Sequence, residues 1–150
     1  ALNGDSIGSV GFLEIIDDFG STNTGNLAKA YAGVCYYRLG NYEDAISFLK
    51  KYKQKDKVLG PTFTGLIGDS YANLNNTTEA INYFKKAADE ANNEVLSPIY
   101  LKKAGVAYES LGQYQDAISM FTQIEDKYSA SAEGRTIEKD ILRAKGLLNK

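Results

Sequence analysis

The sequence predicts an all-α fold in which antiparallel helix pairs stack in chain order, and three observations support this prediction. The stretch LGNYEDAISFL at 39–49 returns as LGQYQDAISMF at 111–121, and a weaker copy, LNNTTEAINYF, lies between them at 74–84. Apolar residues in these copies recur every three or four positions, which is the spacing of one helix face. A glycine or asparagine stands near the start of each copy, where a preceding helix would end. Such repeats indicate helical units that share one continuous core.

The three copies align on their alanines, Ala45, Ala80 and Ala117, which gives periods of 35 and 37 residues. Small and aromatic residues elsewhere in the copies then fall into register. They are Gly33, Gly68 and Gly105, then Tyr36, Tyr71 and Tyr108 three residues later, and Leu49, Phe84 and Phe121 four residues after the alanines. We expect close helix packing at these positions, with each glycine facing the alanine of its partner helix.

The chain opens with IGSVGFLEIIDDF at 7–19, which predicts the second helix of a pair whose first helix is not in this sequence. We therefore expect the sequence to be part of a longer protein. At the other end, Ile137, Ile141, Ala144 and Leu148 form a single apolar stripe. The charged residues behind this stripe predict a solvated face, as a capping helix requires. They are Glu138, Asp140, Arg143 and Lys145.

The helix boundaries between these ends have sequence signals of their own. Three residues that tolerate the left-handed conformation would close the first helices. They are Gly40, Asn75 and Gly112. Asn41 with Asp44, and Asn76 with Glu79, predict N-caps of the second helices with an acidic partner reaching back. Pro61 and Pro98 occupy the start of a first helix, where the missing N–H costs nothing.

These residues together resemble the pattern of the tetratricopeptide repeat family. One copy reads Gly33, Tyr36, Gly40, Tyr42, Ala45, Leu49 and Tyr52, and another reads Gly105, Tyr108, Gly112, Tyr114, Ala117, Phe121 and Ile124. The middle copy keeps Gly68, Tyr71, Ala80, Phe84 and Ala87 but has Asn75 and Thr77 in place of the second glycine and tyrosine. The resemblance implies a right-handed superhelix (α-solenoid) in a single domain over 1–150. Its parts are a half repeat at 7–19, repeats at 26–59, 61–94 and 98–131, and a capping helix at 132–149.

Composition limits the function classes. With 150 residues, 43% of them hydrophobic and 24% charged, the chain can bury the core of one globular domain. A net charge of −2 argues against nucleic-acid binding, which needs a concentrated basic surface. No apolar run approaches the length of a membrane span. One cysteine cannot form an internal disulfide.

A catalytic, metal or cofactor site is not predicted. Without histidine there is no Ser-His or Cys-His nucleophile and no imidazole ligand. Cys35 aligns with the small residues Ser70 and Ala107, which favours a packing position over a reactive thiol. The acidic pairs 17–18 and 89–90 diverge by about 100° on a helix, so a solvated face explains them better than a metal site. An enzyme subunit would need catalytic residues from another chain.

Lysines are concentrated in LKKYKQKDK at 49–57. Positive charge at the end of a second helix complements the helix dipole, which gives a structural explanation. The alternative is a contact for an acidic partner or for an anionic lipid surface.

The resemblance also implies a binding site, because the family lines a concave groove with residues of its first helices and receives an extended peptide there. Mapped onto this sequence, the lining comes from all three repeats. It consists of Leu27, Ala30, Val34, Tyr37, Thr62, Gly65, Asp69, Ala72, Ile99, Lys102, Val106 and Glu109. Co-chaperones of the family grip a C-terminal carboxylate with lysine, asparagine and arginine at such positions. Only Lys102 would qualify here, so we do not expect that form of binding.

The first repeat is apolar on two faces, because Leu27, Tyr31, Val34 and Tyr37 lie apart from the core stripe. An apolar stripe of this size is normally covered. The cover is either an upstream repeat or chain terminus, an apolar segment of a partner, or the same face of a second copy. The last case would make the protein a self-associating homodimer, which is the alternative to a peptide-binding scaffold.

The stretch at 11–45 also resembles repeats of bacterial cell-envelope proteins, in which segments rich in Ser, Thr and Asn link successive units. These include the periplasmic partner of the Tol–Pal system and the membrane-anchored ancillary subunit of the Sec translocon. The resemblance implies a periplasmic, N-terminally anchored protein, with the membrane reached only through a segment absent from this sequence. A cytoplasmic location is the alternative. The expected function is a non-enzymatic scaffold that needs no cofactor and binds a protein or peptide.

Overall fold

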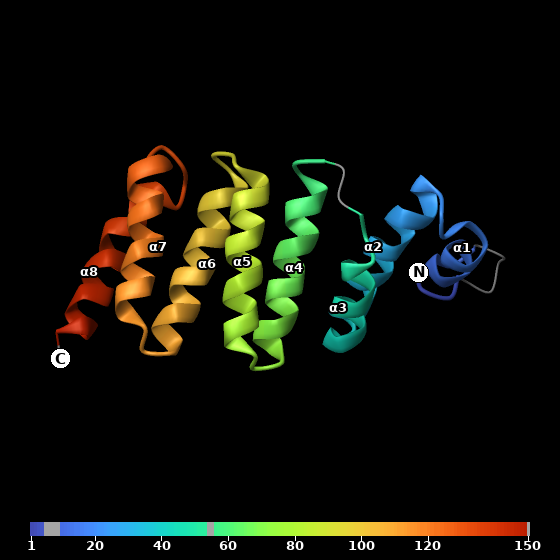
Figure 1. Ribbon diagram of the computed structural model, residues 1–150, viewed down its shortest axis with the longest axis horizontal. Helices are drawn as coiled ribbons and strands as arrows, with labels where there is room; N and C mark the ends of the chain where they lie inside the picture. Colours follow the sequence, from blue (N-terminus) through green and yellow to red (C-terminus); the bar gives the residue numbers. More distant parts are fainter. Residues whose placement is uncertain (5–9, 54–55, 150) are drawn as a thin grey trace.

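The computed structural model describes residues 1–4, 10–53 and 56–149, and over these residues the chain forms a row of helices in sequence order (Figure 1). The helices are α1 (Phe12–Phe19), α2 (Asn23–Arg38), α3 (Tyr42–Lys50), α4 (Leu59–Asn73), α5 (Thr77–Ala91), α6 (Leu96–Ser110), α7 (Tyr114–Lys127) and α8 (Ile137–Leu148), with a 3₁₀ turn η1 (Gly134–Thr136) before α8. Each helix packs on the next one along the chain in an antiparallel pair. The predicted all-α stack of helix pairs is therefore confirmed.

The repeated glycines lie where the two helices of a pair cross. A Cβ atom added to Gly33 would lie 2.6 Å from Leu49 Cγ, and one added to Gly68 would lie 2.7 Å from Phe84 Cδ1. The same atom on Gly105 would overlap the ring of Phe121. The glycines therefore make room for the large residue that follows the repeat alanine by four positions. The expectation that glycine faces alanine needs this correction, since the nearest alanine atom at Gly33 and Gly68 is a backbone carbonyl oxygen and the nearest atoms at Gly105 all belong to Phe121.

The turns between paired helices follow the prediction. Gly40, Asn75 and Gly112 adopt positive φ angles of 81°, 58° and 71°. Asn92, which ends α5, has a φ of 43° and closes its helix in the same way, although no sequence signal was assigned to it. Asparagine and glycine therefore end four of the helices in the left-handed region among the described residues.

The N-caps follow the prediction only in part. Asn76 Oδ1 accepts a hydrogen bond from the Glu79 N–H at 3.3 Å, as predicted. Asn41 precedes α3, but its side chain makes no cap hydrogen bond, so that prediction is wrong. The prolines of the second and third repeats are the third residues of α4 and α6, inside the first turn, where their missing N–H has no helical partner.

The buried side chains form two clusters. The N-terminal core consists of Ala30, Ile46, Leu49, Phe63 and Ile67 from α2, α3 and α4, and the C-terminal core consists of buried residues from α5 to α8. Tyr71 packs against both clusters and so connects them. Helix α1 contributes no buried residue. The C-terminal half of the stack is thus the better packed half.

The two ends of the chain differ from their predictions in detail. The first predicted helix, 7–19, is observed from Phe12, and residues 7–9 lie outside the described part of the chain. Helix α8 begins at Ile137 and not at 132. Leu148 is 45% exposed, so it does not extend the buried stripe.

Asp140 was predicted on the solvated face of the capping helix and is instead 4% exposed. Burial of this carboxylate is compensated by two cations close to it, one of which comes from α6. Among the described residues, no helix combines the length and the hydropathy needed to cross a bilayer.

Candidate functional site

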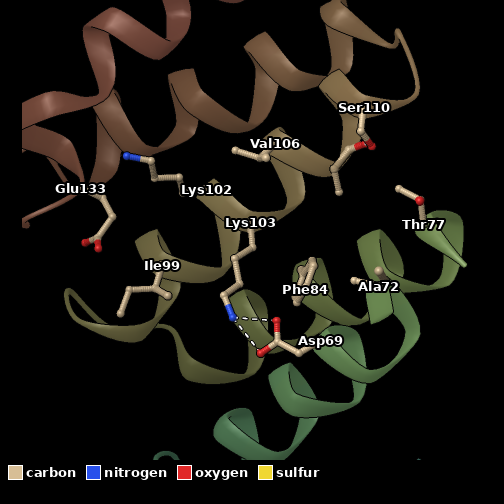
Figure 2. A pocket seen from close by; sticks show the side chains of 12 residues that line it. Asp69, Ala72, Thr77, Phe84, Ile99, Lys102, Lys103, Val106, Ser110 and Glu133 are labelled. Carbon is tan, nitrogen blue, oxygen red and sulfur yellow. Dashed lines mark hydrogen bonds and ion pairs between the residues drawn. The ribbon is translucent and has the colours of Figure 1, made fainter. Parts of the chain in front are cut away.

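A groove with a volume of about 520 Å³ opens where α4, α5 and α6 meet (Figure 2). Phe84 and Ala80 are buried and form its base, and the exposed side chains of Ala72 and Val106 form part of its rim. Ala72 and Thr77 lie near one end of the view, and Glu133, from the segment before η1, lies at the other. The complete lining is Asp69, Ala72, Thr77, Ala80, Phe84, Ile99, Lys102, Lys103, Val106, Ala107, Ser110 and Glu133.

An ion pair joins the two first helices across this groove. Lys103 Nζ lies 2.7 Å from Asp69 Oδ1 and 2.8 Å from Asp69 Oδ2 (Figure 2). The same ammonium group lies 5.5 Å from the centre of the Phe84 ring and 6.0 Å from that of Tyr100. A cation over aromatic rings is attracted to their faces, so the aromatic base of the groove helps to hold Lys103 beside Asp69.

A second charged network joins α6 to α8. Lys102 Nζ lies 3.2 Å from Asp140 Oδ2, and Arg143 Nη1 donates to Asp140 Oδ1 at 2.6 Å. Arg143 also donates to both carboxylate oxygens of Glu109, at 3.2 and 2.8 Å. The network contains two cations and two carboxylates, so it is neutral as a whole.

Burial and hydrogen bonding act on Asp140 in opposite directions. Burial, the largest single effect, favours the neutral acid, but hydrogen bonds from Arg143 and Lys102 and their positive charges outweigh it, so the pKa of Asp140 is lower than its ordinary value. The hydrogen bond to Glu109 is the largest effect on Arg143 and raises the pKa of its guanidinium group. Both groups are therefore charged at neutral pH.

Five residues of the predicted binding surface line this groove. They are Asp69, Ala72, Ile99, Lys102 and Val106. Glu109 faces α8 and binds Arg143 instead. Thr62 is exposed on α4 outside the groove, and its hydroxyl donates to the Val58 carbonyl at 2.6 Å. The site that the structure offers is thus narrower than the predicted surface.

Ala30 and Gly65 are buried and do not line a surface. Ala30 has no exposed area and belongs to the N-terminal core. Gly65 is covered by the ring of Tyr100 from α6. Both predictions fail for the same physical reason. The rotation of a helix about its axis depends on which side chains the neighbouring helices pack against it, and the register of the repeats does not specify those side chains.

The apolar face of the first repeat is partly covered by the chain itself. Tyr31 stacks on Phe12 of α1 with ring centres 5.8 Å apart, and it meets Phe63 of α4 edge-on at 6.2 Å. Leu27 and Val34 are half-buried against the N-terminal core. Tyr37 is half-buried, with its ring 5.5 Å from that of Tyr42.

The described lysines of the 50–57 run include three with contacts inside the protein. Lys50 Nζ donates to Tyr71 Oη at 2.8 Å and lies over the rings of Tyr71 and Tyr83, and the hydrogen bond to Tyr71 raises its pKa. Lys51 Nζ lies 4.6 Å from the centre of the Phe48 ring. The backbone of Lys53 is hydrogen-bonded in both directions to the side chain of Asn26. Lys55 lies outside the described residues.

Several groove residues were missed by sequence reasoning. Lys103, Thr77, Ala107, Ser110 and Glu133 all line the groove but were not assigned to it. The 34-residue separation of Asp69 and Lys103, close to one repeat period, was a usable signal for the pair. Glu133 lies between helices, so a map based on first-helix positions does not include it. Over residues 1–4, 10–53 and 56–149, no group of three or more acidic or cysteine side chains is placed to hold a metal ion.

The helix pairs form a row, pack closely at glycines where their helices cross, and leave a groove on the side of the first helices. This arrangement defines a helical repeat protein of the α-solenoid class. Two family models, both described as tetratricopeptide repeat, match the sequence, one over residues 66–132 and the other over 31–56. The chain belongs to the tetratricopeptide repeat family.

Solved structures that share this fold include a putative kinesin light chain of Podosopora anserina with nearly identical TPR-like repeats. Its TM-score is 0.68 at 13% sequence identity, and the match covers 92% of this chain and 76% of that one. MamA has a TM-score of 0.64 at 18% identity, with 92% and 85% covered. PcrH, solved in complex with the chaperone binding region of PopB, has a TM-score of 0.61 at 17% identity, with 84% and 96% covered. At these identities the likeness concerns the fold. No curated protein matches the sequence.

Proposed function

We propose that this protein is a non-catalytic scaffold that binds a polypeptide segment of a partner protein in the groove between α4, α5 and α6. The observation that supports this function most directly is the groove itself, which has an apolar base, carries the apolar side chains of Ala72 and Val106 on its rim, and spans two successive repeats. Three of the four charged side chains in its lining, Asp69, Lys102 and Lys103, are engaged in ion pairs, which leaves those three poorly suited to proton transfer. The similarly folded PcrH was solved with a region of PopB bound, which supports the proposal by analogy.

The test is peptide display against the immobilised protein, with each enriched peptide re-measured on two variants. Val106→Asp places a charge on the groove rim, where the native side chain is 47% exposed and the fold should tolerate the change. Leu142→Asp places the same charge on α8, at a site that is 60% exposed and outside the groove lining, and serves as the matched control. We expect enriched peptides to lose binding to the Val106 variant only. Peptides that bind both variants equally would contradict the groove assignment.

Self-association through the first repeat is the second candidate, and the structure gives it less support. The face that would form the dimer already packs on α1 and α4 through Tyr31. Light scattering of Val34→Asp separates the two candidates. A dimer that dissociates in this variant would favour self-association, whereas a monomer in both proteins would leave the groove as the binding surface.

We also propose a bacterial envelope location for the native protein, on the periplasmic side and attached to the membrane by a segment N-terminal to this sequence. The composition that motivates this is that of STNTGN at 21–26, which is rich in Ser, Thr and Asn and leads from the α1–α2 turn into the first turn of α2. Fractionation of cells that carry the tagged full-length protein tests it. Recovery with the cytosol would overturn the proposal.

A further inference from the structure

We infer that the groove selects a partner segment in which a basic side chain neighbours an apolar one, and this inference rests on the binding function proposed above. It concerns the chemistry of the partner, which the fold alone does not define. The argument depends on which charges in and beside the groove are already neutralised and which are not.

The two lysines of the main groove are committed to internal carboxylates. Lys103 is held by both oxygens of Asp69 and by two aromatic rings. Lys102 pairs with Asp140, whose side chain is only 6% exposed. A partner carboxylate that drew Lys102 away would leave a buried carboxylate with Arg143 as its remaining partner, and burying such a charge without full compensation is costly. The groove is therefore poorly prepared to receive an acidic segment.

The opposite charge is available at one end of the groove. There it continues into a second hollow of about 540 Å³ that shares Ile99 and Glu133 with it. Glu94 also lines this hollow, and within the described part of the chain neither glutamate makes an ion pair. The lining contains one cation, the exposed Lys127, so carboxylates outnumber cations there.

Apolar surface lies directly beside these carboxylates. Val95, which is 67% exposed, and Ile99 line the second hollow, and Val106 continues the apolar surface along α6. Figure 2 shows Ile99 between Glu133 and the Asp69–Lys103 pair. An aliphatic side chain seated over Ile99, which both hollows share with Glu133, would place a neighbouring lysine or arginine within reach of Glu133. No internal ion pair needs to break for this to happen.

The experiment uses three fluorescent peptides of equal length, acetylated and amidated so that no terminal charge contributes. The first peptide has leucine next to lysine, the second has leucine next to glutamate, and the third has serine next to lysine. Binding is measured by fluorescence anisotropy in about 150 mM salt, where long-range electrostatic attraction is screened. We expect the leucine–lysine peptide to bind most tightly. The variant Glu133→Gln should weaken its binding about fivefold. Glu138→Gln, which removes the same charge from an exposed site on α8, should leave it unchanged.

Each outcome decides the inference. Equal losses in the Glu133 and Glu138 variants would mean that only net charge matters, and this would overturn it. Tighter binding of the leucine–glutamate peptide, abolished by Val106→Asp, would overturn it while leaving the proposed function intact. No binding of the leucine–lysine peptide up to about 1 mM also overturns it. If peptides bind but Val106→Asp affects none of them, both the inference and the proposed function fail.

Discussion

Gly105 lies against the ring of Phe121 with no space for a methyl group, whereas a Cβ atom on Gly146 would meet nothing within 4 Å. These two glycines, both inside helices, separate two effects of a glycine-to-alanine change. Alanine improves helix propensity at either site, because it restricts the unfolded chain. At Gly105 the added methyl must also displace a fully buried aromatic ring.

Gly105→Ala should lower the free energy of unfolding by about 1–3 kcal/mol, because overpacking exceeds the gain in propensity. Gly146→Ala should raise it by about 0.5–1 kcal/mol. Urea unfolding followed by circular dichroism measures both. Equal effects in the two variants would show that the glycine–aromatic contact does not define the crossing.

Asp140 allows a second test at the level of one residue, in which the stability of the fold is measured as a function of pH. Its pKa in the folded protein lies below the ordinary 3.8, so folding favours the ionised form. The resulting stabilisation is complete above about pH 5, begins to fall as the pH approaches the ordinary value, and is lost as the pH falls through the lowered folded value. Between about pH 5 and pH 2, the native protein should therefore lose stability more steeply than Asp140→Asn. Parallel curves for the two proteins would contradict the assigned network.

Individual residues also show where sequence reasoning stops. The left-handed positions Gly40, Asn75 and Gly112 were predictable, because their conformation is a local property of the chain. The burial of Asp140 was not predictable, since it depends on Lys102, which lies in another helix. A charged residue in an amphipathic pattern is assigned to solvent unless its distant partner is known.

At the scale of whole helices, ion pairs connect alternate members of the stack. Asp69–Lys103 joins α4 to α6, and Glu109–Arg143 joins α6 to α8, and both pairs span 34 residues. Exposed pairs contribute little to stability. Arg143, however, contacts two carboxylates that are themselves mostly shielded from solvent, with side-chain exposures of 12% and 6%. Its removal leaves both without their strongest donor.

Arg143→Gln should therefore lower the free energy of unfolding by about 1–2 kcal/mol, a value reduced from that of a fully buried pair because the arginine itself is half-exposed. The matched control is Arg135→Gln, which changes an exposed arginine of η1 whose side chain makes no hydrogen bond or ion pair within the described part of the chain. Thermal unfolding of the two variants gives the comparison. A control variant as unstable as Arg143→Gln would show that net charge alone is responsible.

Helix identity and order were predictable because each repeat contains its own apolar period and its own turn. The rotation of each helix about its own axis was less predictable, as Ala30 and Gly65 demonstrate. Both occupy positions assigned to a concave surface and are instead buried by neighbours. The groove was therefore predicted in its central residues on α4 and α6, but its α5 base and its Glu133 end were not.

Stability is distributed unevenly over the whole molecule. The C-terminal core spans α5 to α8, whereas α3 has only nine residues and α1 has no buried residue. Among consecutive helices of the described chain, α3 and α4 make the smallest contact. In a repeat array each unit is stabilised by its neighbours, so a weak junction allows one end to open separately.

Hydrogen exchange should therefore be faster in α1 to α3 than in α5 to α7 under native conditions. Mass spectrometry of peptic fragments resolves the two halves. Uniform protection along the chain would mean that the described helices unfold as a single unit, and the proposed division at the α3–α4 junction would be wrong.

The groove spans two repeats, and its occupation by a polypeptide is the central claim. The most direct measurement is an NMR titration of methyl-labelled protein with a peptide selected by display. The account predicts shifts concentrated at Ala72, Ile99 and Val106, with the exposed methyl groups of Val10 and Leu142 unchanged. Shifts of equal size at Val10 and Leu142, or unchanged groove methyl groups in the presence of bound peptide, would contradict it.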